Sequence, residues 1–244
     1  MIVSFFNRKG GVGKTSISFL VSKYLAATGA RVLYLDLDPQ RTATSHFERR
    51  EGLDHDALKR DSVFDVLLGR RAAAEVIVPA GDMFLLPGSF DVAEIQATVG
   101  PFAMRDILKD ESFDFCIVDH APNWSALIQS GLFASDCVVV PTQAAVEDME
   151  QAEWSVQKVR QVSPEAKIGV LLNQYAAGKL EREVLDAFAL PYLETTLPRS
   201  GLVRRYTATG EGLNTRAKAK AAFAGQIAGL VSEITGTRSP VEAF

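Results

Sequence analysis

Cysteine is scarce in this chain, which has two among its 244 residues, Cys116 and Cys137. Each lies inside an apolar run of strand length, and the two are far apart in the sequence, so we expect both thiols to be buried and unbridged. Without a closely spaced pair, the sequence offers neither a disulfide framework nor ligands for an iron–sulfur cluster. These absences exclude small disulfide-stabilised proteins and cluster-dependent reductases.

Long apolar runs and a positive net charge are also absent. No run approaches the ~20 residues that span a bilayer, and the N-terminus lacks a basic region followed by an apolar stretch and a cleavage site. We therefore expect a cytoplasmic protein. Its net charge of −4 gives no general attraction to nucleic acids, so any such binding must depend on local clusters of basic residues.

Strand-length apolar runs alternate with longer helical patterns along most of the chain. Several runs are uninterrupted, which is typical of parallel strands covered on both faces. The sequence predicts an α/β fold: a doubly wound, mostly parallel sheet with helices on both faces. We expect one domain over residues 1–235 and a flexible tail at 236–244. The predicted strands are 2–6, 32–36, 83–86, 114–118, 136–140, 168–173 and 193–197, and the predicted helices are 14–28, 61–68, 91–97, 102–109, 123–132, 144–161, 179–188, 200–208 and 215–235.

Residues 7–16, Asn-Arg-Lys-Gly-Gly-Val-Gly-Lys-Thr-Ser, lie between the first predicted strand and the first predicted helix. Glycines at such a turn allow backbone N–H groups to close on a phosphate, and the helix N-terminus adds partial positive charge. Lys14 can reach the terminal phosphates of a nucleotide, and the Thr15 hydroxyl can bind Mg²⁺. The usual spacing would place glycine where Arg8 stands, and a second lysine, Lys9, precedes the glycine pair. The predicted phosphate-binding residues are Lys9, Gly10, Gly11, Val12, Gly13, Lys14, Thr15 and Ser16.

Three acidic residues follow apolar strands, and a site that hydrolyses a nucleotide requires acids for Mg²⁺ and for the attacking water. Asp36 and Asp38 end the second predicted strand, two residues apart, so their side chains point to the same side of an extended chain. Asp119 follows the strand predicted at 114–118. Together with the glycine-rich loop, these strand ends predict a hydrolytic nucleotide site.

These motifs, in this order, resemble those of the ParA/MinD family of deviant Walker A ATPases. The resemblance rests on Lys-Gly-Gly-Val-Gly-Lys-Thr at 9–15, Asp-Leu-Asp-Pro-Gln at 36–40 and the acid at 119. Pro-Thr-Gln at 141–143 and Leu-Pro-Arg at 197–199 resemble the ParA branch in particular. The similarity extends over residues 1–235.

The resemblance implies a role for each motif residue. Two subunits would enclose two ATP molecules, with Lys9 reaching across the homodimer to the nucleotide of the partner subunit. Lys14 would hold the β- and γ-phosphates within its own subunit, and Asp38 would position the hydrolytic water. Lys9, Lys14 and Asp38 are therefore the expected catalytic residues. The residues expected around Mg²⁺, directly or through water, are Thr15, Asp36 and Asp119.

The stretch that follows the strand predicted at 168–173 indicates which base is bound. Guanine sites use Asn-Lys-x-Asp, whereas residues 173–176 read Asn-Gln-Tyr-Ala and lack the carboxylate that guanine needs. Asn173 and the backbone of Pro198 match the adenine pocket of the family, so the resemblance favours ATP. Alternatively, Asn173 is a turn residue at the end of its strand.

The chain departs from the family pattern at three places. Arg41 stands where glycine follows Pro-Gln in the ParA pattern, and His120-Ala121 replaces Thr-Pro after the acid at 119. Both changes concern the switch loops and the rate of hydrolysis rather than nucleotide binding. Residues 203–206, Val-Arg-Arg-Tyr, replace an acidic stretch of the family and change the charge of the surface.

Basic residues cluster between positions 199 and 220, where six of them accompany a single acid, Glu211. The local net charge of +5, in a chain of net charge −4, suggests a footprint for phosphate backbones. The resemblance implies the same, because ParA-type dimers bind DNA without sequence preference through C-terminal basic residues. A solvated cationic face is the alternative. The residues expected to contact DNA are Arg199, Arg204, Arg205, Arg216, Lys218 and Lys220.

Two further features concern membranes and partners. The last predicted helix has apolar residues at helical spacing, but a single basic residue follows position 220, whereas a membrane-surface helix carries several. We therefore expect it to pack on the domain, with no membrane binding. Trp154 lies among acidic residues, off the apolar stripe of its predicted helix. It either receives a basic peptide, such as the N-terminus of a ParB-like activator, or packs at the domain edge.

Together these observations favour a cytoplasmic, nucleoid-associated positioning ATPase. ATP binding would close a homodimer that coats DNA, and a ParB-like or cargo-adaptor protein would stimulate slow hydrolysis and release it. The cargo is either plasmid or chromosome DNA or a protein assembly such as a carboxysome. The alternatives are a MinD-like regulator on a membrane and an ATP-dependent metabolic enzyme on the same scaffold.

Overall fold

The computed structural model of this chain describes residues 1–108, 112–203 and 218–236. Within them lies an eight-stranded sheet made of β1 (Ile2–Phe5), β2 (Val32–Asp36), β3 (Val78–Ala80), β4 (Met83–Leu86), β5 (Phe115–Asp119), β6 (Cys137–Thr142), β7 (Lys167–Asn173) and β8 (Tyr192–Leu197). The strand order is β3-β4-β2-β5-β1-β6-β7-β8. Neighbouring strands are parallel except for β3 and β4, which form an antiparallel edge.

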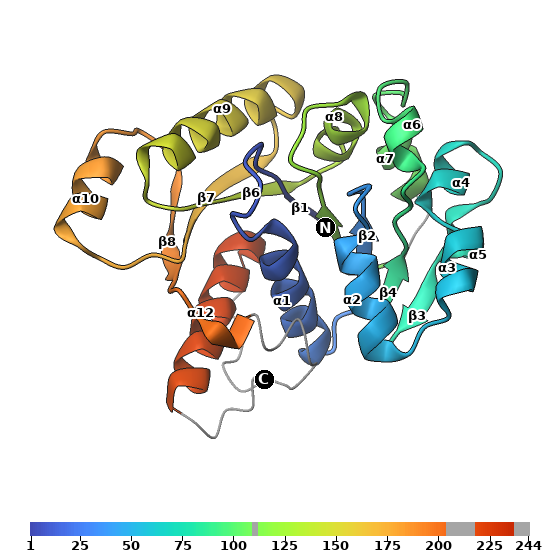
Figure 1. The fold of residues 1–244 in the computed structure, drawn as a ribbon, viewed down its shortest axis with the longest axis horizontal. Coiled ribbons are helices and arrows are strands. Elements are labelled where there is room, and N and C mark those ends of the chain that lie inside the picture. Colours follow the sequence, from blue (N-terminus) through green and yellow to red (C-terminus); the bar gives the residue numbers. More distant parts are fainter. Residues whose placement is uncertain (109–111, 204–217, 237–244) are drawn as a thin grey trace.

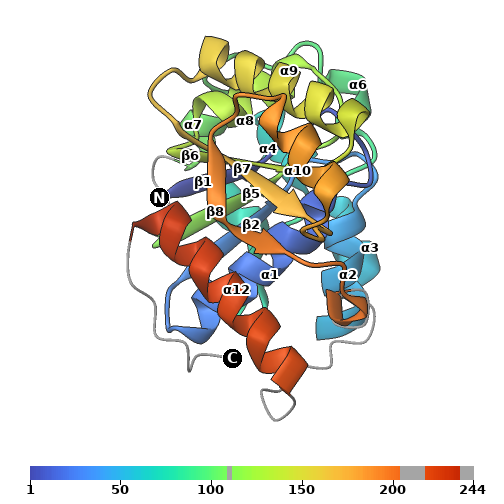
Figure 2. The same ribbon diagram turned by 90° about the vertical axis from the view of Figure 1, so that its left-hand side faces the viewer.

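Helices cover both faces of this sheet, as Figures 1 and 2 show. They are α1 (Lys14–Ala27), α2 (Thr42–Glu51), α3 (His55–Arg60), α4 (Val63–Leu67), α5 (Ala73–Val76), α6 (Val92–Ile95), α7 (Ala103–Leu108), α8 (Ala126–Phe133), α9 (Val146–Val162), α10 (Lys179–Asp186) and α12 (Lys218–Thr235). α1, α2 and α12 cover one face, where Phe19, Phe47 and Phe223 join one apolar cluster with the strands. α8 and α9 cover the other face. The sheet is therefore the middle of three layers, which is the doubly wound arrangement.

The functional edge of the sheet is set by its strand order. β1 pairs with β5 on one side and with β6 on the other. Asp119 of β5 lies opposite Phe5 of β1 and, across its other edge, opposite Asp36 of β2. The carboxyl ends of β1, β2 and β5 thus meet at the crevice where doubly wound folds bind ligands.

The predicted fold class is confirmed, and each predicted strand is present to within two residues of its predicted ends. The sequence pattern does not predict β3, because this strand is three residues long and contains proline. It also misses α2, whose sequence Thr-Ala-Thr-Ser-His-Phe-Glu-Arg-Arg-Glu is mostly polar and buries a narrow stripe. The short helices α3 and α5 are missed as well. Recognising these elements requires the surfaces on which they pack.

Some predictions fall on parts of the chain that the structure does not describe. Of the helix predicted at 200–208, residues 201–203 are helical, Ser200 is not, and residues 204–208 lie outside the described residues. The predicted tail at 236–244 also lies outside them, except for Gly236.

Both cysteines are buried and neither forms a disulfide, as predicted. Cys116 lies in β5 and Cys137 begins β6, and burial raises the pKa of the Cys137 thiol to about 11. In the described part of the chain, no helix is both long and apolar enough to cross a membrane. In α12, the side chains of Phe223, Ile227 and Leu230 are buried in the main apolar cluster, so this helix packs on the domain as predicted.

Candidate nucleotide site

A glycine-rich loop joins β1 to α1 at the predicted position. Gly11 and Gly13 have φ angles of +77° and +100°, in the left-handed region that favours glycine. A Cβ atom on Gly13 would lie 2.5 Å from Nδ2 of Asn173. That nitrogen donates a hydrogen bond of 2.8 Å to the carbonyl oxygen of Val12. The end of β7 is therefore fixed directly against the loop, which explains why glycine is required at position 13.

Asn7, which the sequence patterns did not single out, holds the start of the loop. It is buried, its Nδ2 donates to the Pro141 carbonyl oxygen of β6 at 2.9 Å, and its Oδ1 accepts the Lys9 N–H at 2.8 Å. The Arg8 N–H donates to the hydroxyl of Ser155 in α9 at 3.2 Å. Pro141 and Ser155 lie more than 130 positions away in sequence, so no local pattern could have identified this anchoring of the loop.

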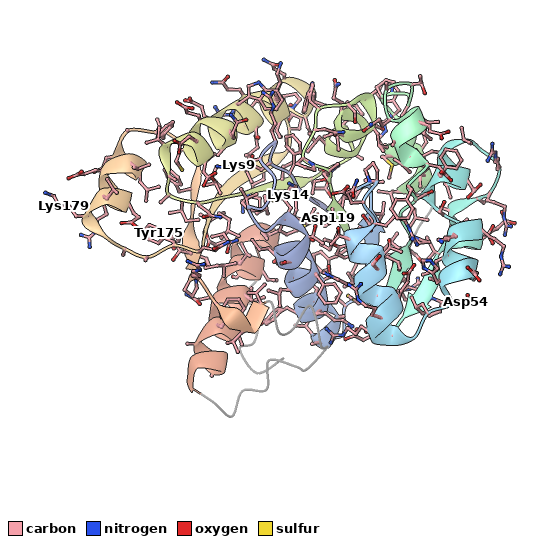
Figure 3. All side chains as sticks on the ribbon, in the orientation of Figure 1. Lys9, Lys14, Asp54, Asp119, Tyr175 and Lys179 are labelled. Carbon is pink, nitrogen blue, oxygen red and sulfur yellow. The ribbon has the colours of Figure 1, made fainter. Side chains whose placement is uncertain are left out.

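Lys14 is buried at the start of α1, and its Nζ donates to the Lys9 carbonyl oxygen at 3.1 Å. Burial lowers the pKa of the Lys14 ammonium, and the nearby carboxylates of Asp119 and Asp38 oppose this shift. Figure 3 shows Lys14 and Asp119 close to the N-terminal end of α1, with Lys9 farther toward α9. A partly desolvated ammonium at a helix N-terminus is well suited to hold a phosphate.

Asp119 ends β5 and is fully buried. Within the described part of the chain, neither of its carboxylate oxygens has a hydrogen-bond partner. Burial raises the pKa of Asp119 well above its usual value, Asp36 adds to the shift, and Thr15 and Lys14 oppose it. A buried carboxylate with open oxygens costs free energy until a cation or a donor satisfies it. Asp119 is therefore a candidate to bind a cation or to accept a hydrogen bond from a ligand.

Asp36, at the end of β2, differs from Asp119 because protein donors already occupy its carboxylate. Oδ2 accepts the Thr44 N–H at 2.8 Å and the Thr44 hydroxyl at 2.7 Å, and Oδ1 accepts the Asp38 N–H at 3.2 Å. Burial raises the pKa of Asp36 to about 6, although these hydrogen bonds oppose the rise. In this geometry Asp36 holds the loop after β2 and the first turn of α2; its predicted place around Mg²⁺, directly or through water, stays a prediction.

Asp38 lies on the loop after β2, where its Oδ1 accepts the Gln40 N–H at 2.9 Å. It lines a cavity of about 270 Å³ together with the glycine-rich loop, Lys14, Thr15 and Pro122. The structure thus brings the predicted water-positioning acid, the phosphate-binding lysine and the Mg²⁺-binding hydroxyl to one cavity. In the described residues, no group of three or more His, Cys, Asp or Glu side chains forms a metal cage.

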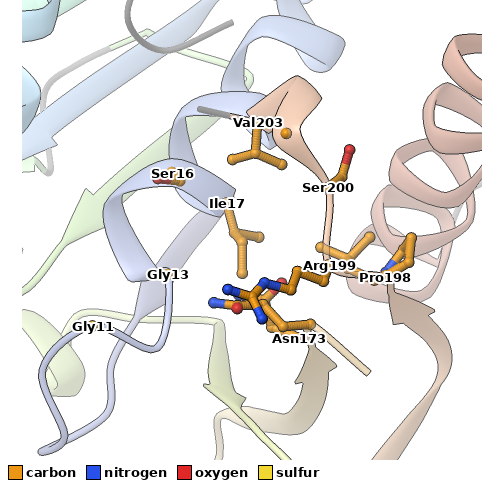
Figure 4. Close-up of a pocket in the computed structure, with 12 residues that line it drawn as sticks. Gly11, Gly13, Ser16, Ile17, Asn173, Pro198, Arg199, Ser200 and Val203 are labelled. Atoms are coloured by element: carbon orange, nitrogen blue, oxygen red, sulfur yellow. The ribbon is translucent and has the colours of Figure 1, made fainter. Parts of the chain in front are cut away.

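A larger cavity of about 470 Å³ also borders this loop (Figure 4). Gly11, Gly13 and Ser16 line both cavities. The larger cavity continues to Asn173, at the end of β7, and to Pro198, after β8. The predicted phosphate-binding and base-binding residues therefore surround one continuous length of loop, as an extended nucleotide requires.

The predicted DNA-binding residues do not form one group in the structure. Arg199 lines the larger cavity beside Pro198 (Figure 4). Lys218 and Lys220 belong to the first turn of α12. The remaining three, Arg204, Arg205 and Arg216, lie outside the described residues.

Lys9, the second lysine of the loop, forms an ion pair with Asp148 in the first turn of α9. The Lys9 side chain is 39% exposed, whereas that of Asp148 is 7% exposed. Lys9 therefore points away from the cavity that Lys14 enters, toward the rim formed by α9. An acid at this position in α9 is a partner for Lys9 that the sequence patterns did not identify.

His120 directly follows Asp119 in the chain and packs in the interior. It is fully buried, its Nε2 lies 2.9 Å from the Ser4 hydroxyl, and that hydroxyl lies 2.7 Å from the hydroxyl of Ser135. A Cβ atom on Gly131 would lie 2.4 Å from the imidazole ring, so α8 packs closely on it. Burial lowers the pKa of His120 to about 3. This departure from the family pattern is thus a neutral packing residue in the described structure.

Trp154 packs at the edge of the domain, which is one of the two roles predicted for it. Its ring lies 5.5 Å from that of Trp124, at nearly a right angle, and the Arg8 guanidinium lies 4.8 Å from its centre. Arg8, the residue that replaces glycine in the usual loop, therefore joins the phosphate loop to α9 through a cation–π contact.

Comparison with known proteins agrees with this geometry. Residues 1–169 match the family model of an AAA domain. The chromosome-partitioning ATPase Soj of Thermus thermophilus is 32% identical over 210 residues, which cover 81% of each chain. The chromosome partitioning protein ParA of Myxococcus xanthus is 29% identical over 218 residues, which cover 82% of this chain and 75% of that protein.

Solved structures share the fold along almost the whole chain. A plasmid partition protein of Borrelia burgdorferi bound to AMPPNP aligns with a TM-score of 0.82 at 17% identity, covering 96% of this chain and 99% of that one. Cobyrinic acid a,c-diamide synthase of Mycobacterium smegmatis, with ADP and magnesium, aligns with a TM-score of 0.76 at 29% identity, covering 98% and 97%. The matching family model, the relatives and the site together show that the chain belongs to the ParA-type partition ATPases of the ParA/MinD family.

Proposed function

We propose that this chain binds ATP with Mg²⁺, closes into a homodimer around two nucleotides, attaches to DNA without sequence preference, and leaves DNA when a partner stimulates hydrolysis. The observation that carries the proposal is the meeting of Lys14, Thr15, Asp38 and Asp119 around the glycine-rich loop. Such a cycle would let the protein partition or position a cargo.

The residues present fit a magnesium ion. Asp119 supplies a buried carboxylate whose oxygens have no partner in the described residues, and Thr15 supplies a hydroxyl nearby. Bound with ATP, Mg²⁺ would neutralise phosphate charge and take its other ligands from phosphate oxygens and water. We assign Asp119 and Thr15 to the ion, and Asp36 to holding the loop that carries Asp38. The similar synthase of Mycobacterium smegmatis contains ADP and magnesium, which supports a nucleotide with magnesium as the ligand.

The chain's own residues would then divide the work of hydrolysis. Lys14, already desolvated, binds the terminal phosphates and stabilises the charge that develops on them. Asp38, half-buried on its loop, lies at the mouth of the same cavity and orients the attacking water. Asn173 and the Pro198 backbone bind the adenine in the larger cavity, and Arg199 lies at its rim.

Lys9 would provide the contact between subunits. Its ammonium is partly exposed and is held by one acid of the same chain, Asp148. In the homodimer we propose that Lys9 exchanges this ion pair for the phosphates of the partner subunit's nucleotide. Because Asp148 is buried, the exchange leaves its carboxylate without Lys9, so the contact of Lys9 with phosphate must compensate for the lost ion pair.

The DNA footprint would lie on the C-terminal part of the chain. Lys218 and Lys220 begin α12, and they are close in sequence to Arg204, Arg205 and Arg216. Such a cluster attracts phosphate backbones regardless of sequence and makes binding depend on salt concentration. A ParB-like or cargo-adaptor protein is the proposed activator, and the nucleoid is the proposed location.

Replacing Lys9 by alanine tests the dimer. We expect Lys9→Ala to bind ATP but to raise the dimer dissociation constant at least ~100-fold, because its contact spans the two subunits. Light scattering after size exclusion, with ATP and then with ADP, measures this. Lys179→Ala, at a 93% exposed side chain, is the control and should dimerise normally. A Lys9→Ala protein that dimerises and binds DNA like the wild type would contradict the proposal.

Replacing Asp38 by alanine tests hydrolysis separately. The variant should keep ATP-dependent dimerisation and DNA binding, while phosphate release falls by about 100-fold or more. Equal turnover of variant and wild type would remove Asp38 from its proposed role.

A second candidate function is an ATP-dependent metabolic reaction. The observation that favours it is the 29% identity to cobyrinic acid a,c-diamide synthase over nearly the whole chain. The two functions differ in their ligands, so ATP-dependent binding to DNA of random sequence, lost as salt is raised, decides for the partition ATPase.

A further inference from the structure

Arg41 follows the Asp38 loop and adopts an unusual backbone conformation. Its φ angle is +52° and its ψ angle +33°, in the left-handed region, and its N–H closes the loop on the Asp38 carbonyl oxygen at 2.9 Å. Glycine occupies such a conformation without strain, whereas a residue with a Cβ atom is strained there. Strain of this kind persists where surrounding contacts compensate for it, and it often marks a functional position.

The Arg41 side chain supplies those contacts. It is 1% exposed and is among the largest fully buried side chains of the described residues. Its Nε donates to the Gly88 carbonyl oxygen at 2.8 Å, and one terminal nitrogen donates to Glu48 Oε1 at 2.7 Å. The guanidinium also lies 5.4 Å from the centre of the Phe90 ring. A single side chain thus joins the Asp38 loop, α2 and the loop after β4.

A second set of hydrogen bonds fastens the same loop at its other end. The Thr44 hydroxyl donates to Asp36 Oδ2 at 2.7 Å and accepts the Gly88 N–H at 2.8 Å. Asp36 in turn accepts the Asp38 N–H at 3.2 Å. The loop that carries Asp38 is therefore attached on one side to Asp36 and on the other to Arg41, and both attachments include Gly88.

We propose that Arg41 is a positioning residue, which holds the Asp38 loop against the loop at Gly88 so that Asp38 stays at the nucleotide cavity for hydrolysis. The inference rests on the proposed role of Asp38. Removing one partner would leave the buried Arg41 guanidinium incompletely paired, which is strongly destabilising. We therefore expect its contacts to Gly88 and Glu48 to form and break together. Arg41 touches neither cavity wall of the glycine-rich loop, so it acts on rate and not on nucleotide affinity.

Replacing Arg41 by glycine tests the proposal. Glycine accepts the φ angle of +52° and removes all three side-chain contacts at once. We expect kcat for ATP hydrolysis to fall about tenfold, because a small displacement of a positioned group reduces the rate strongly. KM for ATP should stay within about twofold of the wild type. Arg41→Lys, which keeps the charge but not the forked donors, should have an intermediate kcat.

Amide hydrogen exchange without nucleotide gives a readout independent of activity. In Arg41→Gly, exchange should rise in residues 37–44 and 87–91, with no change in the central strands. Arg50→Gln is the matched control: Arg50 lies on the same helix, pairs with Glu51, and has its guanidinium 5.4 Å from the centre of the Phe19 ring. It should leave kcat and the exchange of residues 37–44 at wild-type values.

Two results would overturn the proposal: wild-type kcat in Arg41→Gly, or increased exchange throughout the sheet with kcat and KM changing together. If Arg41→Gly does not fold, Arg41→Lys and Glu48→Gln decide by the same measurements, and wild-type kcat in both would overturn it. Asp38→Ala separates this inference from the proposed function. Normal turnover in Asp38→Ala would remove the role of Asp38 itself. If Asp38→Ala loses turnover while Arg41→Gly turns over normally, only the role of Arg41 is rejected.

Discussion

The ends of β2 and β5 carry the same residue type in almost the same place. Asp36 and Asp119 lie opposite each other in register, and both are fully buried. Yet Asp36 accepts three hydrogen bonds from Thr44 and Asp38, whereas neither oxygen of Asp119 has a partner in the described residues. The comparison teaches that burial and strand position alone do not show that a carboxylate binds a ligand. Carboxylate oxygens without a hydrogen-bond partner are the feature that indicates one.

The difference extends to the surroundings of each acid. The end of β2 belongs to a polar network with Thr44, Gly88 and Arg41, in which each group satisfies another. The end of β5 faces Lys14 and Thr15 at the start of α1. The hydrogen bonds at the end of β2 stabilise the fold, whereas the unpaired carboxylate at the end of β5 lowers its stability. Functional sites often lower the stability of the fold that carries them.

Asp119→Asn should have the largest effect and would sharpen the comparison most. Without the carboxylate we expect turnover at least ~100-fold lower. The free energy of unfolding of the nucleotide-free protein should rise by roughly 1 kcal/mol, because an unpaired buried charge is removed. Phosphate release and urea unfolding measure the two effects. Loss of stability together with normal turnover would mean that Asp119 is a structural acid.

Asp36→Asn should show the opposite pattern. One oxygen of the carboxylate becomes an NH₂ group that faces the N–H donors of Thr44 or Asp38, so we expect the free energy of unfolding to fall by about 1–3 kcal/mol. Turnover should fall less than in Asp119→Asn, because no nucleotide ligand is removed. Urea unfolding and phosphate release again measure both effects. A stable Asp36→Asn protein with weakened Mg²⁺ dependence would place Asp36 at the metal instead.

The dependence of stability on pH gives the smallest predicted effect. A carboxyl whose pKa is raised in the folded state binds more protons there than in the unfolded state, so stability falls as pH rises above the unfolded pKa. For Asp36 this loss is confined to the range from about 4 to about 6. For Asp119, whose pKa is raised well above its usual value, the loss reaches higher pH.

Comparing variants isolates the contribution of Asp119. Urea unfolding of wild type and Asp119→Asn at pH 5 and pH 8 should show an advantage for the variant that is larger at pH 8 than at pH 5, by on the order of 1 kcal/mol. Parallel pH dependence of the two proteins would show that Asp119 has an ordinary pKa.

Much of the fold and of the site follows from local patterns. The glycine-rich loop, with Lys14 and Thr15 after it, is recognisable because a turn that closes on phosphate demands glycine at positions such as Gly13. The buried strands are recognisable because their apolar runs reflect cover on both faces. By contrast, α2 is mostly polar, and without α2 the sequence pattern does not reveal Thr44, the partner that defines the role of Asp36.

The sequence by itself determined the class of sheet, the phosphate loop and the acids at the ends of the strands, since each depends on residues that are neighbours along the chain. Only the tertiary structure decided which acid keeps its oxygens free, that Lys9 pairs with Asp148, and that Arg41 is buried between two loops. The physical reason is that hydrogen bonding and desolvation depend on partners brought together by packing, often more than 100 positions apart in the chain.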